Sequence, residues 1–190
     1  SSSAASDVYK RQVRAIAPNL PIVAEGIPDW HPGFFLAPGK SLNRINVIYA
    51  LHYYAWCRDP SISDGRTETL IARAYAQKRY ADGKKLMVQY FYQVGFFKLQ
   101  DKGYPILFTE IGTDPYLQEG YWSRWMLDLY DIAKERNIGY LQHDFSHTLC
   151  PIPDPNQAGR FIFGMLNKDL VSLSDVGRLW HDSLRSMRKA

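Results

Sequence analysis

The sequence predicts an α/β protein in which helices cover a parallel β-sheet, and two observations support this prediction. Short, continuous apolar segments alternate along the chain with longer segments of helical periodicity, which is typical of strands buried on both faces. The composition, with 46% hydrophobic and 22% charged residues, is that of an ordinary globular protein. A length of 190 residues favours one domain.

Four strands are expected, because four apolar runs stand between breaking residues or helical segments. The first run, PIVAE, is bounded by Gly26 and Pro28, and NVIYALHYYAW, YPILFTE and GYLQHDF follow it along the chain. These strands are expected at residues 21–25, 46–56, 104–110 and 139–145.

The segments between and after these strands have the apolar spacing of helices. A helical tail, VRAIAP, ends at Pro18, and a long helical region runs from Glu68 to Lys102 with a predicted break near Asp82-Gly83. Two further helices are expected at residues 121–136 and 174–187. A closed (β/α)8 TIM barrel has eight such units in about 250 residues, so four units predict half of one. The alternative, a doubly wound sheet, calls for a G-x-G-x-x-G loop that the sequence lacks.

The first twelve residues are expected to be foreign to the protein. Ser2 to Gln12 reads SSAASDVYKRQ, which resembles the translation, codon by codon, of a transposase-type sequencing-library adapter. We therefore expect residues 1–12 to be disordered and adapter-derived, and residues 13–190 to form the folded part. A Ser/Ala-rich disordered leader is the alternative.

Several classes of protein are disfavoured by composition. The net charge of +4 is spread over 23 basic and 19 acidic residues without long runs, so no nucleic-acid partner is expected. No apolar stretch approaches the roughly 20 residues that span a bilayer, so no membrane partner is expected either. Cys57 and Cys150 lack metal-ligand spacing, which predicts no metal site; whether they form a disulfide stays open.

Polar side chains gather where the predicted strands end. Glu25, His52 with Tyr54, Glu110, and His143 with its neighbour Asp144 occupy these ends. In β/α barrels this edge carries the active site. Strict alternation along a strand would also place Ile106, Phe108 and Glu110 on one face. The structural alternatives are a capping or salt-bridged Glu110 and a hydrogen-bonded core histidine at His52.

The ordered segments IVAEG, NVIYALHYY, PILFTEIG and GYLQHDFS resemble strands five to eight of glycoside hydrolase family 5, the cellulase-type clan. The resemblance covers nearly all of the chain after Gln12 and implies the C-terminal half of a (β/α)8 TIM barrel. It implies retaining hydrolysis of glycosidic bonds without a cofactor, with Glu110 of T-E-I-G as the nucleophile. The H-Y-Y segment matches the family's H-x-Y, so Tyr54 would donate a hydrogen bond to Glu110, and His52 would bind a sugar hydroxyl or the acid/base.

The same resemblance implies residues that contact the substrate. Trp56, Trp30 and His143 are candidates for sugar contacts, His143 standing where many members carry a stacking Trp. Glu25 is a candidate for sugar binding or for a supporting role, and a plain loop carboxylate is the alternative. Tyr53 alternates with the candidate residues and is expected to pack against helices.

The acid/base of that family lies in an Asn-Glu pair on strand four, and this sequence begins after the corresponding position. Glu25 is not expected to replace it, because Ala24 rather than Asn precedes it. We therefore expect the chain alone to be inactive, and its partners to be an oligo- or polysaccharide and the missing N-terminal half of the barrel. The alternative is a carbohydrate-binding remnant that cannot cleave; an aldolase-type barrel would need a Lys at a strand end, and none is present. Export to the periplasm or the exterior is expected from the family.

Overall fold

The computed structural model divides into two compact units. The first unit comprises Ser1–His52 and Phe91–Thr109, and the second comprises Tyr53–Tyr90 and Glu110–Ala190. The structure describes residues 2–25, 36, 46–54, 65–113, 121–143, 165–166 and 171–187.

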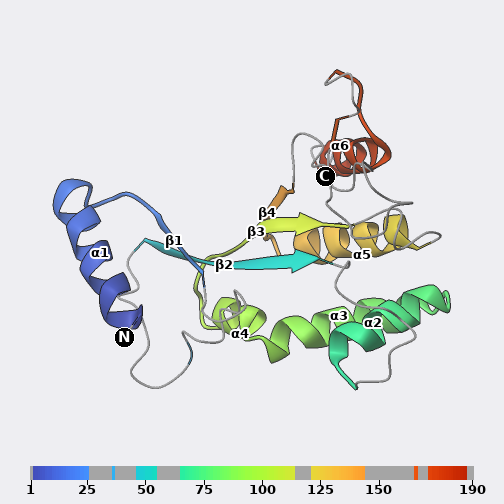
Figure 1. Ribbon diagram of the computed structural model, residues 1–190, viewed down its shortest axis with the longest axis horizontal. Helices are drawn as coiled ribbons and strands as arrows, with labels where there is room; N and C mark the ends of the chain where they lie inside the picture. Colours follow the sequence, from blue (N-terminus) through green and yellow to red (C-terminus); the bar gives the residue numbers. More distant parts are fainter. Residues whose placement is uncertain are drawn as a thin grey trace, which may run out of the picture. The chain divides into compact units, whose positions relative to one another are not determined.

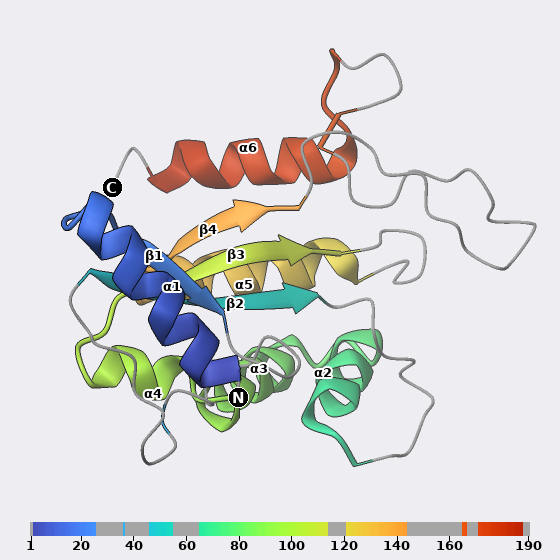
Figure 2. The ribbon, with the colours of Figure 1, turned by 60° about the vertical axis from the view of Figure 1, so that its left-hand side comes forward.

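The sheet has four strands in the order β1-β2-β3-β4. They are β1 (Ile22–Glu25), β2 (Val47–Tyr54), β3 (Ile106–Gly112) and β4 (Gly139–Gln142). β1 and β2 pair in parallel from Ile22 opposite Val47 to Glu25 opposite Ala50, and the arrows of β2 and β3 point the same way in both views (Figures 1 and 2). The predicted α/β class and all four strands are confirmed, although β3 begins and ends two residues later than expected.

The core of the first unit is aromatic. Helix α4 (Phe96–Asp101) follows the end of α3 (Tyr80–Gln93) and contributes Phe96 and Phe97, both fully buried. Phe96 contacts Phe91 and Phe108, and Phe97 contacts Phe91 and Phe96. With the Phe91–Phe108 pair, the ring centroids of these contacts lie 4.7–6.2 Å apart. Aromatic pairs of this kind add about 0.5–1.5 kcal/mol each beyond the burial of their area, so they hold β3 to the helices that precede it.

Helix α1 (Ser2–Ile16) corrects the prediction that residues 1–12 are disordered. No Gly or Pro interrupts the chain between Ser2 and Ile16, and Ala, Lys, Arg and Gln are favourable helix formers. The helix ends just before the Ala17-Pro18 pair, as predicted, because proline disfavours helical geometry in the residue that precedes it. The adapter origin of this segment stays a prediction.

The described part of the second unit is mainly helical. Its helices are α2 (Thr67–Ala76), α3 (Tyr80–Gln93), α5 (Trp122–Glu135) and α6 (Asp175–Met187). α6 packs against α5. Its first turn is capped by the Ser174 hydroxyl, which accepts a hydrogen bond from the Gly177 amide at 3.0 Å. Both helices predicted for the C-terminal half are therefore confirmed.

The long helical region between β2 and β3 breaks at other places than predicted. α2 ends at Ala76, where Lys78 adopts a left-handed backbone with φ 58°, and α3 ends before Gly95, with φ 83°. Gly83 lies inside α3 instead of ending a helix. A Cβ atom there would stand 2.5 Å from the Tyr75 ring, so this glycine provides room for a neighbouring side chain.

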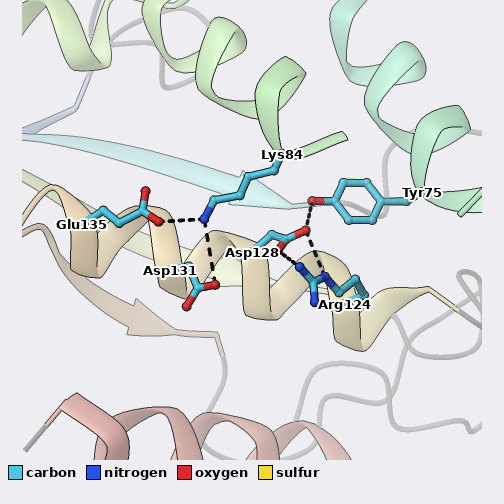
Figure 3. Close-up of polar contacts among 6 residues, drawn as sticks. All are labelled: Tyr75, Lys84, Arg124, Asp128, Asp131 and Glu135. Atoms are coloured by element: carbon cyan, nitrogen blue, oxygen red, sulfur yellow. Dashed lines mark hydrogen bonds and ion pairs between the residues drawn. The ribbon is translucent and has the colours of Figure 1, made fainter. Parts of the chain in front are cut away.

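Polar contacts join α5 to the two helices beside it (Figure 3). The Tyr75 hydroxyl of α2 donates to Asp128 Oδ2 at 2.7 Å, and Arg124 Nη2 lies 2.8 Å from Asp128 Oδ1. Lys84 Nζ of α3 lies 2.8 Å from Glu135 Oε1 and 3.9 Å from Asp131 Oδ2. Asp128 is 1% exposed, whereas the partners of Lys84 are exposed.

Within the described residues, no helix has the length and apolar character needed to cross a membrane.

Candidate active site

The end of β2 and the end of β3 place two predicted site residues in contact. The Tyr54 hydroxyl donates a hydrogen bond to Glu110 Oε2. Both side chains are half-buried, so the pair is partly removed from water while part of its surface stays open. A hydroxyl that donates to a carboxylate favours the ionised form of the acid and fixes its direction. This is the contact that the sequence predicts for Tyr54.

The prediction that Glu110 lies on the same face of β3 as Phe108 is wrong. Phe108 does not share a face with it, because Phe108 is fully buried against Phe91 and Phe96 of the preceding helices. Burial alternates along β3 up to Thr109 and then shifts by one residue, so that Glu110 is half-buried where alternation would bury it.

His143 follows β4 and adjoins the same tyrosine. Its ring centroid lies 5.7 Å from that of Tyr54 with the planes at 85°, an edge-on contact. The His143 amide donates to the Ile111 carbonyl at 2.8 Å, which holds the end of β4 to β3. The structure therefore brings together Tyr54, Glu110 and His143, three of the predicted site residues.

A second polar cluster lies in the first unit. Glu25, the last residue of β1, accepts hydrogen bonds at Oε1 from His52 Nε2 and Thr109 Oγ1, both at 3.0 Å. Because an ionised carboxylate only accepts, the His52 proton sits on Nε2 in this contact. The side chains of His52 and Glu25 are 18% and 36% exposed, so the cluster is within reach of solvent. Of the predicted roles for Glu25, this geometry favours support of His52.

Thr109 was missed by sequence reasoning, because strict alternation turns it away from Glu110 and gives it no role. Gly112, the last residue of T-E-I-G, was also missed: a side chain there would meet the Tyr54 ring. Tyr53 is buried and stacks on Trp125 with centroids 5.2 Å apart, which confirms that it packs against a helix. The candidates Trp30 and Trp56 lie outside the described residues, as do Cys57, Cys150 and Asp144.

Across the described part of the chain, no group of three or more His, Cys, Asp or Glu side chains could hold a metal ion. At Glu110 the structure places a carboxylate together with a hydroxyl that donates to it, that of Tyr54. A carboxylate held in this way can act as a nucleophile or as a base.

Neither a protein-family model nor a curated protein matches this sequence, but solved structures do. The catalytic domain of the major endoglucanase from Xanthomonas campestris pv. campestris matches with a TM-score of 0.59 and 14% identity, over 99% of this chain and 50% of that one. A complex of an endocellulase from Pyrococcus horikoshii with cellotetraose matches with a TM-score of 0.57 and 16% identity, over 97% of this chain and 47% of that one. A glycoside hydrolase 5 lichenase from Caldicellulosiruptor sp. F32 has a TM-score of 0.53 and 13% identity, with 94% and 47% covered.

The chain thus spans about half the length of the structures that it matches. Its four-stranded parallel sheet and covering helices have the fold of part of a (β/α)8 barrel, as the sequence predicts.

Proposed function

We propose that this chain is the strand-five-to-eight half of a retaining β-glycosidase of the cellulase type, in which Glu110 is the nucleophile. The observation that carries the proposal is the hydrogen bond from Tyr54 to Glu110, made where two strands of a barrel-type sheet end. Barrel enzymes build their active sites at this edge. The order of the motifs H-Y-Y and T-E-I-G along the chain assigns these strands as six and seven.

Glu110 would act in two steps that conserve atoms and charge. Its carboxylate attacks the anomeric carbon of a bound glycan, and the glycosidic C–O bond breaks as a second carboxylic acid gives its proton to the leaving oxygen. The resulting glycosyl ester is opened by water, which loses a proton to the same second carboxylate and releases Glu110. In retaining enzymes the two carboxyl groups stand about 5–5.5 Å apart. The second carboxylic acid belongs to strand four of the barrel.

The chain's other site residues would orient this chemistry. Tyr54 would hold the Glu110 carboxylate in a fixed direction through its hydrogen bond to Oε2. His143 borders the Tyr54 ring and is placed to contact a sugar. His52, held by Glu25, would present its second ring nitrogen to a sugar hydroxyl or to the acid/base.

The structural neighbours support the substrate class. They carry the names endoglucanase, endocellulase and lichenase, and two of the three are complexes with cellotetraose. A β-glucan or a related oligosaccharide is therefore the substrate that we propose for the complete barrel.

The missing half of the barrel is the protein partner that we propose. β1 and β4 stand at the two edges of the sheet, and each exposes an apolar side chain, Val23 at 47% and Leu141 at 56%. Unpaired strand edges bind other strands. We expect the 190-residue chain alone to self-associate and to lack glycosidase activity. A monodisperse monomer in sedimentation, or Glu110-dependent turnover of an aryl β-glucoside by the chain alone, would contradict this.

The decisive experiment uses a complete barrel, made by extending the chain with the upstream gene sequence. A 2-fluoro β-cellobioside that forms a slowly hydrolysed ester is incubated with the protein, and the labelled peptide is mapped by mass spectrometry. We expect the label on Glu110 and none in a Glu110→Gln variant. Glu135→Gln, the same change at an exposed carboxylate on α5, is the matched control and should label normally.

Two results would overturn the proposal. A label on Glu25 or Asp144 would show that the nucleophile lies elsewhere. Binding of cellotetraose without a label on any residue, and without cleavage, would favour a carbohydrate-binding remnant.

A further inference from the structure

Gly112 lies at the end of β3, where there is no room for a side chain. A Cβ atom at this position would stand 2.9 Å and 3.1 Å from two carbons of the Tyr54 ring and 3.1 Å from the His143 carbonyl oxygen. Among the described glycines, those with positive φ are Gly65, Gly95 and Gly103. The backbone at Gly112 is therefore one that other residues adopt, and the requirement for glycine comes from the space beside Tyr54.

The Tyr54 ring is a rigid body whose far end carries the hydroxyl that binds Glu110. A displacement at the ring edge that faces Gly112 must move that hydroxyl as well. The His143 ring, 5.7 Å away, restricts the space into which the Tyr54 ring could retreat. The geometry points to Gly112 as a positioning residue: its missing side chain lets Tyr54 lie against β3 and direct its hydroxyl at Glu110.

The importance of this position for catalysis rests on the proposed role of Glu110 as nucleophile. The positioning itself does not, because it concerns only Gly112, Tyr54 and Glu110 and can be measured without turnover.

The chain provides an internal comparison for the test. Gly83 stands in the same relation to Tyr75, since a Cβ atom there would lie 2.5 Å and 2.8 Å from carbons of that ring. The Tyr75 hydroxyl likewise donates to a carboxylate, Asp128, at 2.7 Å. Gly83→Ala is thus the matched control, with the same atoms added beside a tyrosine that plays no part in the proposed reaction.

The experiment uses the 190-residue chain with 13C at Cζ of every tyrosine, because the NMR shift of this carbon responds to hydrogen bonding of the hydroxyl. Tyr54→Phe and Tyr75→Phe assign the two signals by their loss. We expect Gly112→Ala to move the Tyr54 signal toward that of free tyrosine and to leave the Tyr75 signal in place. Gly83→Ala should do the reverse. An unchanged Tyr54 signal in Gly112→Ala overturns the inference.

Gly112→Ala could move every NMR signal by weakening the fold as a whole. Urea unfolding of a series of variants tests for this. Overpacking of this kind should lower the folding equilibrium constant about tenfold or more. In a Tyr54→Ala background the obstructing ring is gone, so adding Gly112→Ala should change the urea midpoint little. An equal loss in both backgrounds would assign the effect to the His143 carbonyl and overturn the inference.

In the complete barrel, Gly112→Ala should lower kcat about tenfold or more while KM changes little, since Tyr54 orients the nucleophile and not the substrate. A moved Tyr54 signal in a protein whose Glu110 is never labelled by the fluorinated substrate would refute the proposed function and leave the positioning intact. Label on Glu110 with an unmoved signal would refute the positioning alone.

Discussion

Two tyrosine–carboxylate hydrogen bonds in the described part of the second unit differ in their surroundings. Tyr75 and Asp128 lie between helices, and both are almost completely buried. The guanidinium group of Arg124 forms an ion pair with the Asp128 carboxylate (Figure 3). Tyr54 and Glu110 lie at the ends of two strands, and both are half-buried. The same two kinds of side chain therefore occur once in the interior and once at an edge that solvent reaches.

If Glu110 has the proposed role, burial separates a structural pair from a reactive one. A buried carboxylate is costly unless it is paired and hydrogen-bonded, and Asp128 meets this cost with two partners. Those contacts leave no approach for a substrate. Glu110 is oriented by Tyr54 but keeps part of its surface open, which is the condition for attack on a bound sugar. We therefore expect changes at Glu110 to affect activity and changes at Asp128 to affect stability.

The largest expected effect is the loss of activity in Glu110→Gln within the complete barrel. Removing a covalent catalyst should raise the barrier by roughly 5 kcal/mol or more, a fall in kcat of several orders of magnitude. The measurement is kcat on an aryl β-cellobioside. The comparison predicts that the Asp128→Asn variant, which changes the buried pair, has a normal kcat per folded molecule. A loss at Asp128→Asn as large as that at Glu110→Gln would show that burial does not separate the two roles.

The next largest effect is on stability, and it is expected in the buried Tyr75–Asp128 pair. Asp128→Ala removes the acceptor of a buried hydroxyl and the partner of Arg124, which should cost about 3 kcal/mol in the free energy of unfolding. Urea unfolding of the 190-residue chain measures this cost. The control is Asp131→Ala on the same helix, whose side chain is 59% exposed; it should change stability by less than about 0.5 kcal/mol. Equal costs at the two positions would mean that the contacts of Asp128 do not stabilise the fold.

The regular features of this chain could be predicted from the sequence. Alternating apolar runs and helical segments give four β/α units, and Pro18 and Ser174 mark the boundaries of two helices correctly. The contact between Tyr54 and Glu110 was also predicted, through the order of two family motifs. The strands and helix ends follow from local propensity and side-chain types, whereas the contact between Tyr54 and Glu110 was implied by the resemblance.

The irregular features could not be predicted. The shift in the burial pattern of β3 between Thr109 and Glu110 has no signature in residue type, because regular alternation and a one-residue shift fit the same sequence. The break expected at Gly83 failed for a similar reason: a glycine can end a helix or make room for a ring, and only the packed position of Tyr75 distinguishes the two. These two irregular features set the direction of the Glu110 side chain and the position of the Tyr75 ring.

A smaller effect appears at high pH and belongs to the buried pair. Burial, followed by the hydrogen bond to Asp128, raises the pKa of Tyr75 far above its usual value, and burial raises the pKa of Tyr130 as well. In the unfolded chain these hydroxyls ionise near pH 10. Above that pH the unfolded state loses protons that the folded state keeps, so stability is full below about pH 10 and falls by about 1.4 kcal/mol per pH unit for each such tyrosine.

The test is the dependence of the urea midpoint on pH between 9 and 11 in the 190-residue chain. Tyr75→Phe removes one ionising group, and the decline above pH 10 should become shallower even though the variant is less stable at pH 8. Tyr54→Phe serves as the comparison at the strand ends. A decline of unchanged slope in Tyr75→Phe would show that this hydroxyl ionises equally in the folded and unfolded states.

The smallest expected effect is at Lys84, whose ion pairs lie on the same helix surface as Asp128 but face solvent. Lys84 Nζ contacts Glu135 at 2.8 Å and Asp131 at 3.9 Å, and these partners are 64% and 59% exposed. Exposed ion pairs are worth about 0–1 kcal/mol, because water screens them and two long side chains lose freedom. Lys84→Met keeps the apolar stem and removes the charge, so it should cost less than about 1 kcal/mol, and less still in 1 M salt, where the Debye length falls to about 3 Å. A cost as large as that of Asp128→Ala, unchanged by salt, would mean that the three helices are held by charge at their surface as firmly as by the buried pair. Burial would then no longer explain the difference between the two tyrosine–carboxylate pairs.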